Sequence, residues 1–206
     1  YIQNNKIKVI QNPIARSYTD QVRSSENVAR ENVILHVGRL CNQKGQELAI
    51  KAFAALELNN WELLLLGEGP KRKEYEELIT RLGLVGKVRL LGRIKNVSDY
   101  YLKSSIFVFP SRYEGFPNAL TEAMYMGMPC IAADCPTGPS ELIQNGQNGF
   151  LIPVDDTSVL REKMEQLVSD DQLRKELGEN AHLSVKHLEE NNISNLWKGL
   201  IADSLN

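Results

Sequence analysis

The chain has 206 residues, which is long enough for one large α/β domain, or two small ones, with a substantial core. Hydrophobic residues make up 42% and charged residues 24%, as in an ordinary globular protein, and a formal net charge of −2 gives no electrostatic reason to expect a nucleic-acid or anionic membrane partner. Purely apolar runs such as 63–66 are too short to span a bilayer.

Short apolar runs rich in β-forming residues predict six buried strands, at 33–37, 61–66, 88–91, 106–109, 129–133 and 149–152. Helix-favouring segments between and after them predict helices at 46–58, 97–103, 119–126, 157–168, 171–189 and 193–205. A charged amphipathic helix is also predicted after the turn at 67–70, and it ends at about 82. Residues 8–10 predict a further short strand, and the polar stretch 16–32 predicts a loop.

Strands that alternate with helices require a parallel sheet with right-handed crossovers. The expected fold class is therefore α/β, a Rossmann-like doubly wound parallel sheet of about six strands. Ligands of such sheets bind at the carboxyl ends of the strands, from which the loops at Gly38, Gly67, Gly92 and Ser111 emerge.

The central segment 106–127 reads as strand, polar loop and helix. Pro117 suits the first helical position, and Gly127 suits a left-handed cap at the end of the helix. Three main-chain amides would then lack intrahelical acceptors, those of Asn118, Ala119 and Leu120. Such amides, together with the helix dipole, predict an anion site suited to phosphate.

Glu114 lies in that loop and Glu122 inside the helix, and either could be a solvated surface group. Glu122 would sit roughly 7 Å along the helix from Pro117. Retaining glycoside hydrolases hold their carboxyl groups only about 5 Å apart, so one joint acid/base pair is disfavoured. Two separate contacts to one elongated, phosphorylated and hydroxyl-rich ligand are the functional interpretation.

Two familiar phosphate motifs are excluded. The stretch 67–69 begins like a dinucleotide fingerprint, but Arg72 occupies the third glycine position. The stretch 38–45 is not a Walker loop, because Gln43 precedes the lysine and Gly45 follows it.

Two cations nevertheless remain in the loop after the first buried strand, Arg39 and Lys44. A planar fork and a point charge at a strand's carboxyl end suit a diphosphate, although both could instead be solvated.

The histidines and cysteines form no ligand or nucleophile pattern. The histidines are scattered and are expected to serve packing: His36, His182 and His187. The cysteines have neither an even framework nor a metal-ligand spacing, which predicts free thiols in a reducing compartment: Cys41, Cys130 and Cys135. The chain starts at Tyr1 rather than Met and looks like a piece of a longer protein, so a missing targeting segment proves little.

The joint order of the motifs resembles glycosyltransferase family 4. The resemblance extends over about 34–155 and rests on Gly38-Arg39 with Lys44-Gly45, then 67–70, Gly92, Pro110-Ser111, Glu114-Gly115-Phe116, and Glu122 after seven intervening residues. The helical tail and the entry segment 10–14 also look like that family. The resemblance implies one half of a GT-B fold: residues 1–206 would be the donor-binding domain, with the C-terminal helices packing toward a missing N-terminal acceptor domain.

The resemblance also implies an activity, retaining transfer of a hexosyl or N-acetylhexosaminyl group from a nucleoside-diphosphate sugar to a glycan or lipid-linked acceptor. Segments 116–120 and 135–139 look most like members that use UDP-linked sugars. No cofactor and no metal is expected. The protein would be cytoplasmic, or peripheral at the inner face of the membrane through the missing domain.

The family's site residues are carried over only onto matching positions. The catalytic residues would be Arg39, Lys44 and Glu114. Arg39 and Lys44 would hold the diphosphate and stabilise its charge as the glycosidic bond breaks, and Glu114 would lie beside the transferred sugar and stabilise positive charge near the anomeric carbon. Glu122 would accept hydrogen bonds from the ribose. The remaining donor-binding positions are Gly38, Gly67, Arg93, Ile94, Phe116, Asn118, Ala119 and Leu120, of which Gly67, Arg93 and Ile94 would line the base pocket.

Two other functions stay open. The chain could be a nucleotide-sugar-binding module that is inactive alone, because half of the cleft would be absent. It could also be a sugar-nucleotide epimerase of the same fold, which the Glu114/Glu122 spacing disfavours. The acceptor cannot be inferred from these residues.

Overall fold

The computed structural model describes residues 9–24 and 29–204. Its centre is a six-stranded, all-parallel sheet with the order β3-β2-β1-β4-β5-β6. The strands are β1 (Glu31–Val37), β2 (Glu62–Leu66), β3 (Val88–Gly92), β4 (Ser104–Phe109), β5 (Cys130–Ala133) and β6 (Phe150–Ile152). This strand order is that of a doubly wound Rossmann-like domain, and it confirms the predicted fold class.

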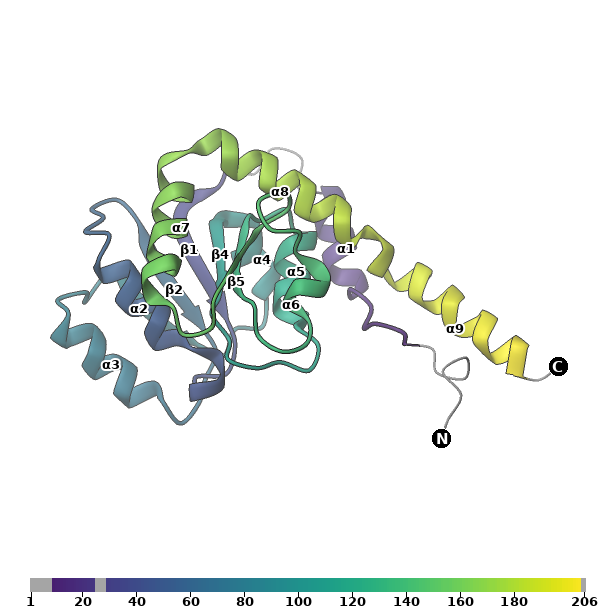
Figure 1. The fold of residues 1–206 in the computed structure, drawn as a ribbon, viewed down its shortest axis with the longest axis horizontal. Helices are drawn as coiled ribbons and strands as arrows, with labels where there is room; N and C mark the ends of the chain where they lie inside the picture. Colours follow the sequence, from purple (N-terminus) through teal and green to yellow (C-terminus); the bar gives the residue numbers. More distant parts are fainter. Residues whose placement is uncertain (1–8, 25–28, 205–206) are drawn as a thin grey trace.

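Helices connect and cover the strands (Figure 1). They are α1 (Arg16–Ser24), α2 (Gln46–Ala54), α3 (Arg72–Arg81), α4 (Val97–Lys103), α5 (Asn118–Tyr125), α6 (Pro139–Leu142), α7 (Thr157–Ser169), α8 (Asp171–Val185) and α9 (Glu190–Ser204), with 3-10 turns at Asn42–Lys44 and Lys186–Leu188. None of the helices within the described residues combines the length and apolar character needed to cross a bilayer.

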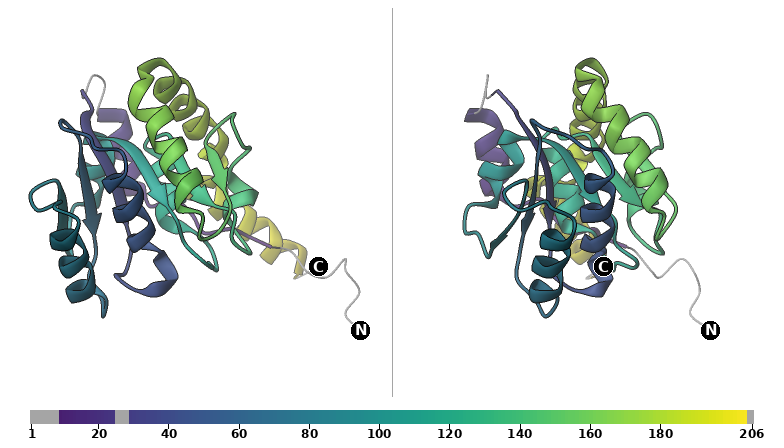
Figure 2. Two further views of the ribbon diagram at one scale, coloured as in Figure 1. Left: turned by 60° about the vertical axis from the view of Figure 1, so that its left-hand side comes forward. Right: turned by 90° about the vertical axis from the view of Figure 1, so that its left-hand side faces the viewer.

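The two faces of the sheet bury separate apolar clusters, because successive side chains of a strand point to opposite faces. Ile34 of β1 belongs to the cluster that contains residues of α2, α3 and α7, whereas its neighbour Leu35 belongs to the cluster that contains residues of α1, α4 and α5. Figure 2 shows α1 in purple and α7 in green on opposite sides of the sheet. Strands covered on both faces need continuous apolar runs, which explains why the strands were recognisable from sequence.

The sheet reverses its winding direction between β1 and β4. The chain runs outward from β1 through β2 to β3, and it then returns to place β4 on the other side of β1. In open α/β sheets, ligands bind at the strand carboxyl ends beside such a reversal. The loops after β1 and β4 are therefore the expected walls of a site.

The predicted loop over 16–32 is wrong, because α1 occupies its first half and β1 begins at Glu31. Tyr18, Thr19 and Val22 of this otherwise polar helix turn toward the sheet, where Tyr18 and Val22 pack against the apolar cluster. The predicted strand at 8–10 is not present at Val9 and Ile10, and Lys8 lies outside the described residues. Helix α2 ends at Ala54, four residues before the predicted end.

Helix α9 extends away from the rest of the domain (Figure 1). Three large apolar side chains on it stay half exposed: Leu196 at 46%, Trp197 at 50% and Ile201 at 56%. Trp197 and Ile201 are four residues apart and so lie on the same helical face, and Leu196 adjoins Trp197, so α9 presents an uncovered apolar stripe.

Candidate nucleotide-sugar site

The carboxyl ends of β1, β2 and β3 are held together by main-chain hydrogen bonds. The amide of Gly38 donates to Leu66 O at 2.9 Å, and the amide of Gly67 donates to Gly92 O at 2.8 Å. Gly67 has φ +136°, and a Cβ there would lie 2.0 Å from the carbonyl oxygen of Gly38. Any other residue would force the two loops apart, so the approach of the β1 and β2 ends depends on this glycine.

A pocket of about 870 Å³ opens at this edge. Five of the predicted donor-binding residues line it: Gly38, Arg39, Gly67, Arg93 and Ile94. The Arg39 side chain is exposed and makes no hydrogen bond or ion pair with any other described residue. Its guanidinium is therefore free to bind a ligand in the pocket.

Lys44 and Glu114 meet at the reversal point between β1 and β4. Lys44 Nζ lies 2.7 Å from Glu114 Oε1 and 3.0 Å from Oε2, and 5.3 Å from the centre of the Phe109 ring. The Lys44 side chain is 19% exposed and that of Glu114 only 6%. The two residues that sequence assigns to the diphosphate and to the sugar thus form one largely buried ion pair.

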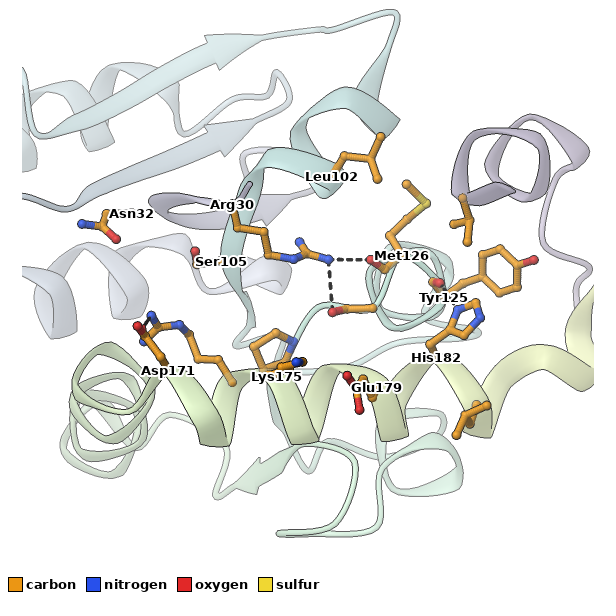
Figure 3. Close-up of a pocket in the computed structure, with 15 residues that line it drawn as sticks. Arg30, Asn32, Leu102, Ser105, Tyr125, Met126, Asp171, Lys175, Glu179 and His182 are labelled. Atoms are coloured by element: carbon orange, nitrogen blue, oxygen red, sulfur yellow. Dashed lines mark hydrogen bonds and ion pairs between the residues drawn. The ribbon is translucent and has the colours of Figure 1, made fainter. Parts of the chain in front are cut away.

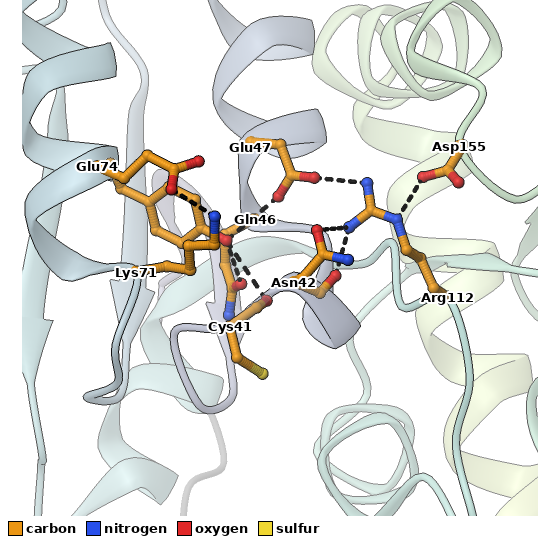
Figure 4. Close-up of polar contacts among 9 residues, drawn as sticks. Cys41, Asn42, Gln46, Glu47, Lys71, Glu74, Arg112 and Asp155 are labelled. Carbon is orange, nitrogen blue, oxygen red and sulfur yellow. Dashed lines mark hydrogen bonds and ion pairs between the residues drawn. The ribbon is translucent and has the colours of Figure 1, made fainter.

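Several hydrogen bonds join the two loops that carry this ion pair. The Arg112 amide donates to Gln43 O, and Gln43 Nε2 donates to Tyr113 O, both at 2.8 Å. The Arg112 guanidinium lies between Glu47 and Asp155, and it also donates to Asn42 O (Figure 4). Arg112 therefore ties the β1–α2 and β4–α5 loops together and to the β6–α7 loop.

Buried polar side chains on the core side of the β1–α2 loop also hold it in place. Gln46 Nε2 donates to Arg39 O at 2.8 Å and faces His36 Nε2 at 3.1 Å, while His36 Nδ1 lies 3.0 Å from Val108 O. Because Gln46 donates to His36 Nε2, the ring carries its proton on Nδ1 and donates to Val108 O. Burial lowers the pKa of His36 to about 4, so it is neutral. This confirms the expected packing role of His36.

Helix α5 begins at Asn118, and Pro117 is its N-cap rather than its first helical residue. The amide of Asn118 donates to Phe116 O at 3.0 Å, so the expectation that this amide is free is wrong. Within the described part of the chain, the amides of Ala119 and Leu120 have no acceptor. The helix N-terminus therefore offers two amides rather than three.

Glu122 is half-buried on α5 and accepts a hydrogen bond from a tyrosine hydroxyl. Tyr101 Oη donates to Glu122 Oε2 at 3.1 Å and also lies 3.3 Å from Ala119 O. Burial raises the pKa of Glu122 above its usual value, and the hydroxyls of Tyr101 and Tyr18 oppose that shift. Sequence reasoning missed Tyr18, Tyr101 and Arg112, because each acts through a partner distant in the chain.

A second pocket of about 720 Å³ lies at the opposite end of the strands, beside α8 (Figure 3). Arg30 lines it, but its guanidinium already donates to four carbonyl oxygens, those of Tyr101, Ser104, Met126 and Gly127. None of the site residues predicted from sequence borders this pocket. Over residues 9–24 and 29–204, no group of three His, Cys, Asp or Glu side chains is placed to hold a metal ion.

The fold and this edge define a class of protein: a Rossmann-like α/β domain with a pocket at the carboxyl ends of β1, β2 and β3, beside the point where its sheet reverses. A family model described as "Glycosyl transferases group 1" matches residues 18–184. The chain belongs to this glycosyltransferase family, and its fold is that of one Rossmann-like half of a GT-B enzyme.

Relatives of known name agree with this assignment. The chain is 32% identical over 204 residues to a Campylobacter jejuni alpha-1,4-N-acetyl-D-galactosaminyltransferase whose named acceptor is linked to PP-undecaprenol. It is 32% identical over 152 residues to the amylovoran biosynthesis glycosyltransferase AmsD of Erwinia amylovora, and these cover 74% of this chain and 43% of AmsD. The crystal structure of Anabaena Alr3699/HepE in complex with UDP superposes with a TM-score of 0.84 at 26% identity, covering 98% of this chain and 58% of that one.

The chain matches between 43% and 58% of the length of these three relatives. The match to the Campylobacter enzyme covers 98% of this chain but only 56% of the relative.

Proposed function

We propose that this chain is the donor-binding domain of a retaining glycosyltransferase that uses a UDP-linked hexose or N-acetylhexosamine. The observation that carries the proposal is the ion pair of Lys44 with Glu114 at the reversal point of the sheet, in which Glu114 comes from the loop that leads into α5, beside the pocket that Arg39 lines. Each part of an elongated ligand made of a base, a ribose, a diphosphate and a sugar can be assigned to protein groups of suitable chemistry along this edge.

In the proposed complex, the base enters the pocket bordered by Gly67, Arg93 and Ile94. The diphosphate lies between the Arg39 guanidinium, the Lys44 ammonium and the free amides of α5. Glu122 accepts hydrogen bonds from the ribose hydroxyls. Phe116, partly buried against the sheet, closes the loop beside the phosphates.

The reaction breaks the bond between the anomeric carbon and the β-phosphate oxygen, and the electron pair of that bond leaves with the diphosphate. A new bond joins the anomeric carbon to the oxygen of the acceptor hydroxyl, whose proton passes to the leaving diphosphate. Negative charge grows on the leaving diphosphate, and positive charge grows on the sugar ring. The Lys44 ammonium and the Glu114 carboxylate lie 2.7 Å apart. In the proposed complex, Lys44 stabilises the negative charge on the diphosphate, and Glu114 stabilises the positive charge on the sugar. Preorganised charges of this kind are a large catalytic term, and they require no metal ion.

The acceptor half is proposed to lie outside this chain and to cover α9. The apolar stripe of Leu196, Trp197 and Ile201 is uncovered here, and the relatives are nearly twice as long as this chain. Several relatives act on lipid-linked or polysaccharide acceptors, which supports an acceptor of the same kind. On this view the chain alone binds the donor without turning it over.

Calorimetric titration with UDP, GDP and ADP tests the nucleotide assignment. Tighter binding of UDP than of the other two supports the proposal, and equal binding of all three contradicts it. Incubation of the full-length protein with UDP-N-acetylglucosamine alone tests the epimerase alternative, because only an epimerase would convert it to an isomer without an acceptor.

A further inference from the structure

The ion pair of Lys44 with Glu114 places a negative charge next to the ammonium group that is assigned to the diphosphate. Glu114 accepts two of the three N–H bonds of Lys44 Nζ, at 2.7 and 3.0 Å, which leaves one donor for a ligand. Among the described side chains, no second cation pairs with Glu114. An anion that binds Lys44 therefore approaches a carboxylate that already contacts the same ammonium group.

The shared nitrogen limits how far apart these two anions can lie. A phosphate oxygen bound by an ammonium group is about 2.8 Å from its nitrogen. Because Glu114 Oε1 is 2.7 Å from the same nitrogen, the two negatively charged oxygens are separated by no more than about 6 Å. Repulsion between two unit charges at that distance weakens binding roughly 3-fold even in the dielectric of water.

The loop that carries Glu114 is fixed by a neighbouring loop. The main-chain oxygen of Glu114 accepts a hydrogen bond from Thr137 Oγ1 of the β5–α6 loop. That loop packs closely on the β4–α5 loop, because a Cβ at Gly138 would lie 2.6 Å from Pro117 Cδ. The Glu114 side chain is also only 6% exposed. The carboxylate therefore stays beside Lys44 when a ligand binds.

The donor and its nucleotide product differ in charge at the phosphate that is nearest the sugar. In a UDP-sugar, the β-phosphate is bonded to the sugar and carries one negative charge. In UDP the β-phosphate is terminal, and a terminal phosphate is doubly charged at pH 8. The product thus carries one negative charge more than the donor, at the end of the diphosphate that faces the sugar and Glu114.

We propose that Glu114 makes the site discriminate against its own product: its carboxylate repels the second charge on the terminal phosphate of UDP, and this favours the donor over UDP. The same repulsion speeds the release of UDP after transfer. The inference rests on the proposed function, in which Lys44 binds the diphosphate, and it gives Glu114 a role in specificity besides its role beside the sugar.

The test compares UDP with its β-methyl ester, which has the same base, ribose and diphosphate but cannot take the second terminal charge. Calorimetry at pH 8 measures both ligands on the wild-type chain and on Glu114→Gln, which removes the charge and keeps the size of the side chain. Glu114→Gln should tighten the binding of UDP more than that of the ester, so the ratio of the ester Kd to the UDP Kd should rise roughly 3-fold.

Two further variants separate this local charge from packing and from the total charge of the chain. Glu114→Asp keeps the charge and should keep the wild-type ratio. Glu77→Gln removes a carboxylate from the exposed face of α3, outside the pocket, and should also keep that ratio. Thermal unfolding checks that each variant is folded.

An unchanged ratio in Glu114→Gln, or equal tightening of UDP and the ester, would overturn the inference and leave the proposed function in place. A ratio that rises as much in Glu114→Asp or in Glu77→Gln would also overturn it, because the local charge would then not be the cause. Failure of the wild-type chain to bind either ligand would overturn the proposed function itself.

Discussion

Lys44 Nζ contacts both carboxylate oxygens of Glu114, at 2.7 and 3.0 Å, although the two residues lie 70 positions apart in the chain. The pair joins the loops that leave β1 and β4, the strands on either side of the reversal point. With 19% and 6% of the side chains exposed, solvent screens this pair far less than a surface pair. It is therefore both a structural contact and the proposed centre of the reaction.

Replacing Lys44 should cost stability, because it leaves the more deeply buried Glu114 without a cation. Lys44→Met should lower the free energy of unfolding by roughly 3 kcal/mol, and Lys44→Met with Glu114→Gln should recover most of that loss. Urea unfolding measures both. Lys71→Ala removes an exposed pair with Glu74 and should change stability by no more than about 1 kcal/mol. Equal effects of the two lysine variants would show that burial adds nothing to the Lys44 pair.

Replacing Arg39 should weaken the binding of UDP without affecting stability. Its exposed guanidinium has no partner among the described residues, so its loss leaves no protein group unsatisfied. Losing a charge-assisted hydrogen bond costs roughly 1.5–3 kcal/mol, or about a 10- to 100-fold drop in affinity. Calorimetry and thermal unfolding of Arg39→Ala measure the two quantities. Arg81→Ala, an exposed arginine outside the pocket, is the control. Wild-type affinity in Arg39→Ala would remove it from the site.

The two glutamates should have separable effects. Glu122→Ala should weaken UDP and the UDP-sugar alike, since both contain the ribose. Glu114→Gln should change UDP affinity less and should lower kcat of the full-length enzyme by one to three orders of magnitude, about 1.4–4 kcal/mol of barrier. Steady-state kinetics and nucleotide titrations distinguish them. Loss of UDP binding in Glu114→Gln, with Glu122→Ala unaffected, would reverse the proposed orientation of the donor.

The ribose contact should depend on pH. Burial raises the pKa of Glu122 above its ordinary value of 4.5, and the carboxylate is the form that accepts two hydroxyl hydrogen bonds. The preference for UDP over 2′,3′-dideoxy-UDP should therefore be full above that pKa and fall as the pH drops through it. The ratio of affinities cancels protonation of the diphosphate. Because the Tyr18 hydroxyl opposes the upward shift, Tyr18→Phe should move the midpoint to higher pH. A ratio that stays constant with pH would contradict the ribose role of Glu122.

The full-length enzyme should keep its activity in excess EDTA. Arg39, Lys44 and the α5 amides supply positive charge at the position where a metal ion would otherwise stabilise a diphosphate. Turnover is measured after chelation and again after addition of Mg²⁺ or Mn²⁺. Activity that is lost on chelation and restored by either ion would show that these residues do not suffice.

Local patterns were enough to predict the sheet and much of the candidate site. Buried parallel strands need unbroken apolar runs such as 106–109, and Gly67 follows such a run where two loops approach closely. Glu114 and Glu122 stand on either side of the start of a helix that follows a strand, and their separation of eight positions can be counted in the sequence. Such features depend on residues that are close together in the sequence, so they can be predicted from the sequence.

Other features came only from the tertiary structure. Helix α1 has a polar sequence, and it becomes recognisable only because Tyr18 packs on Tyr101 across the domain. The ion pair of Lys44 with Glu114 requires β1 and β4 to be neighbours, and that follows from the strand order. Pairing between residues 70 and 83 positions apart depends on which elements share a face, and local spacing carries no information about that. The sequence by itself therefore determined the types of residue available at the site, whereas packing decided which of them act on one another.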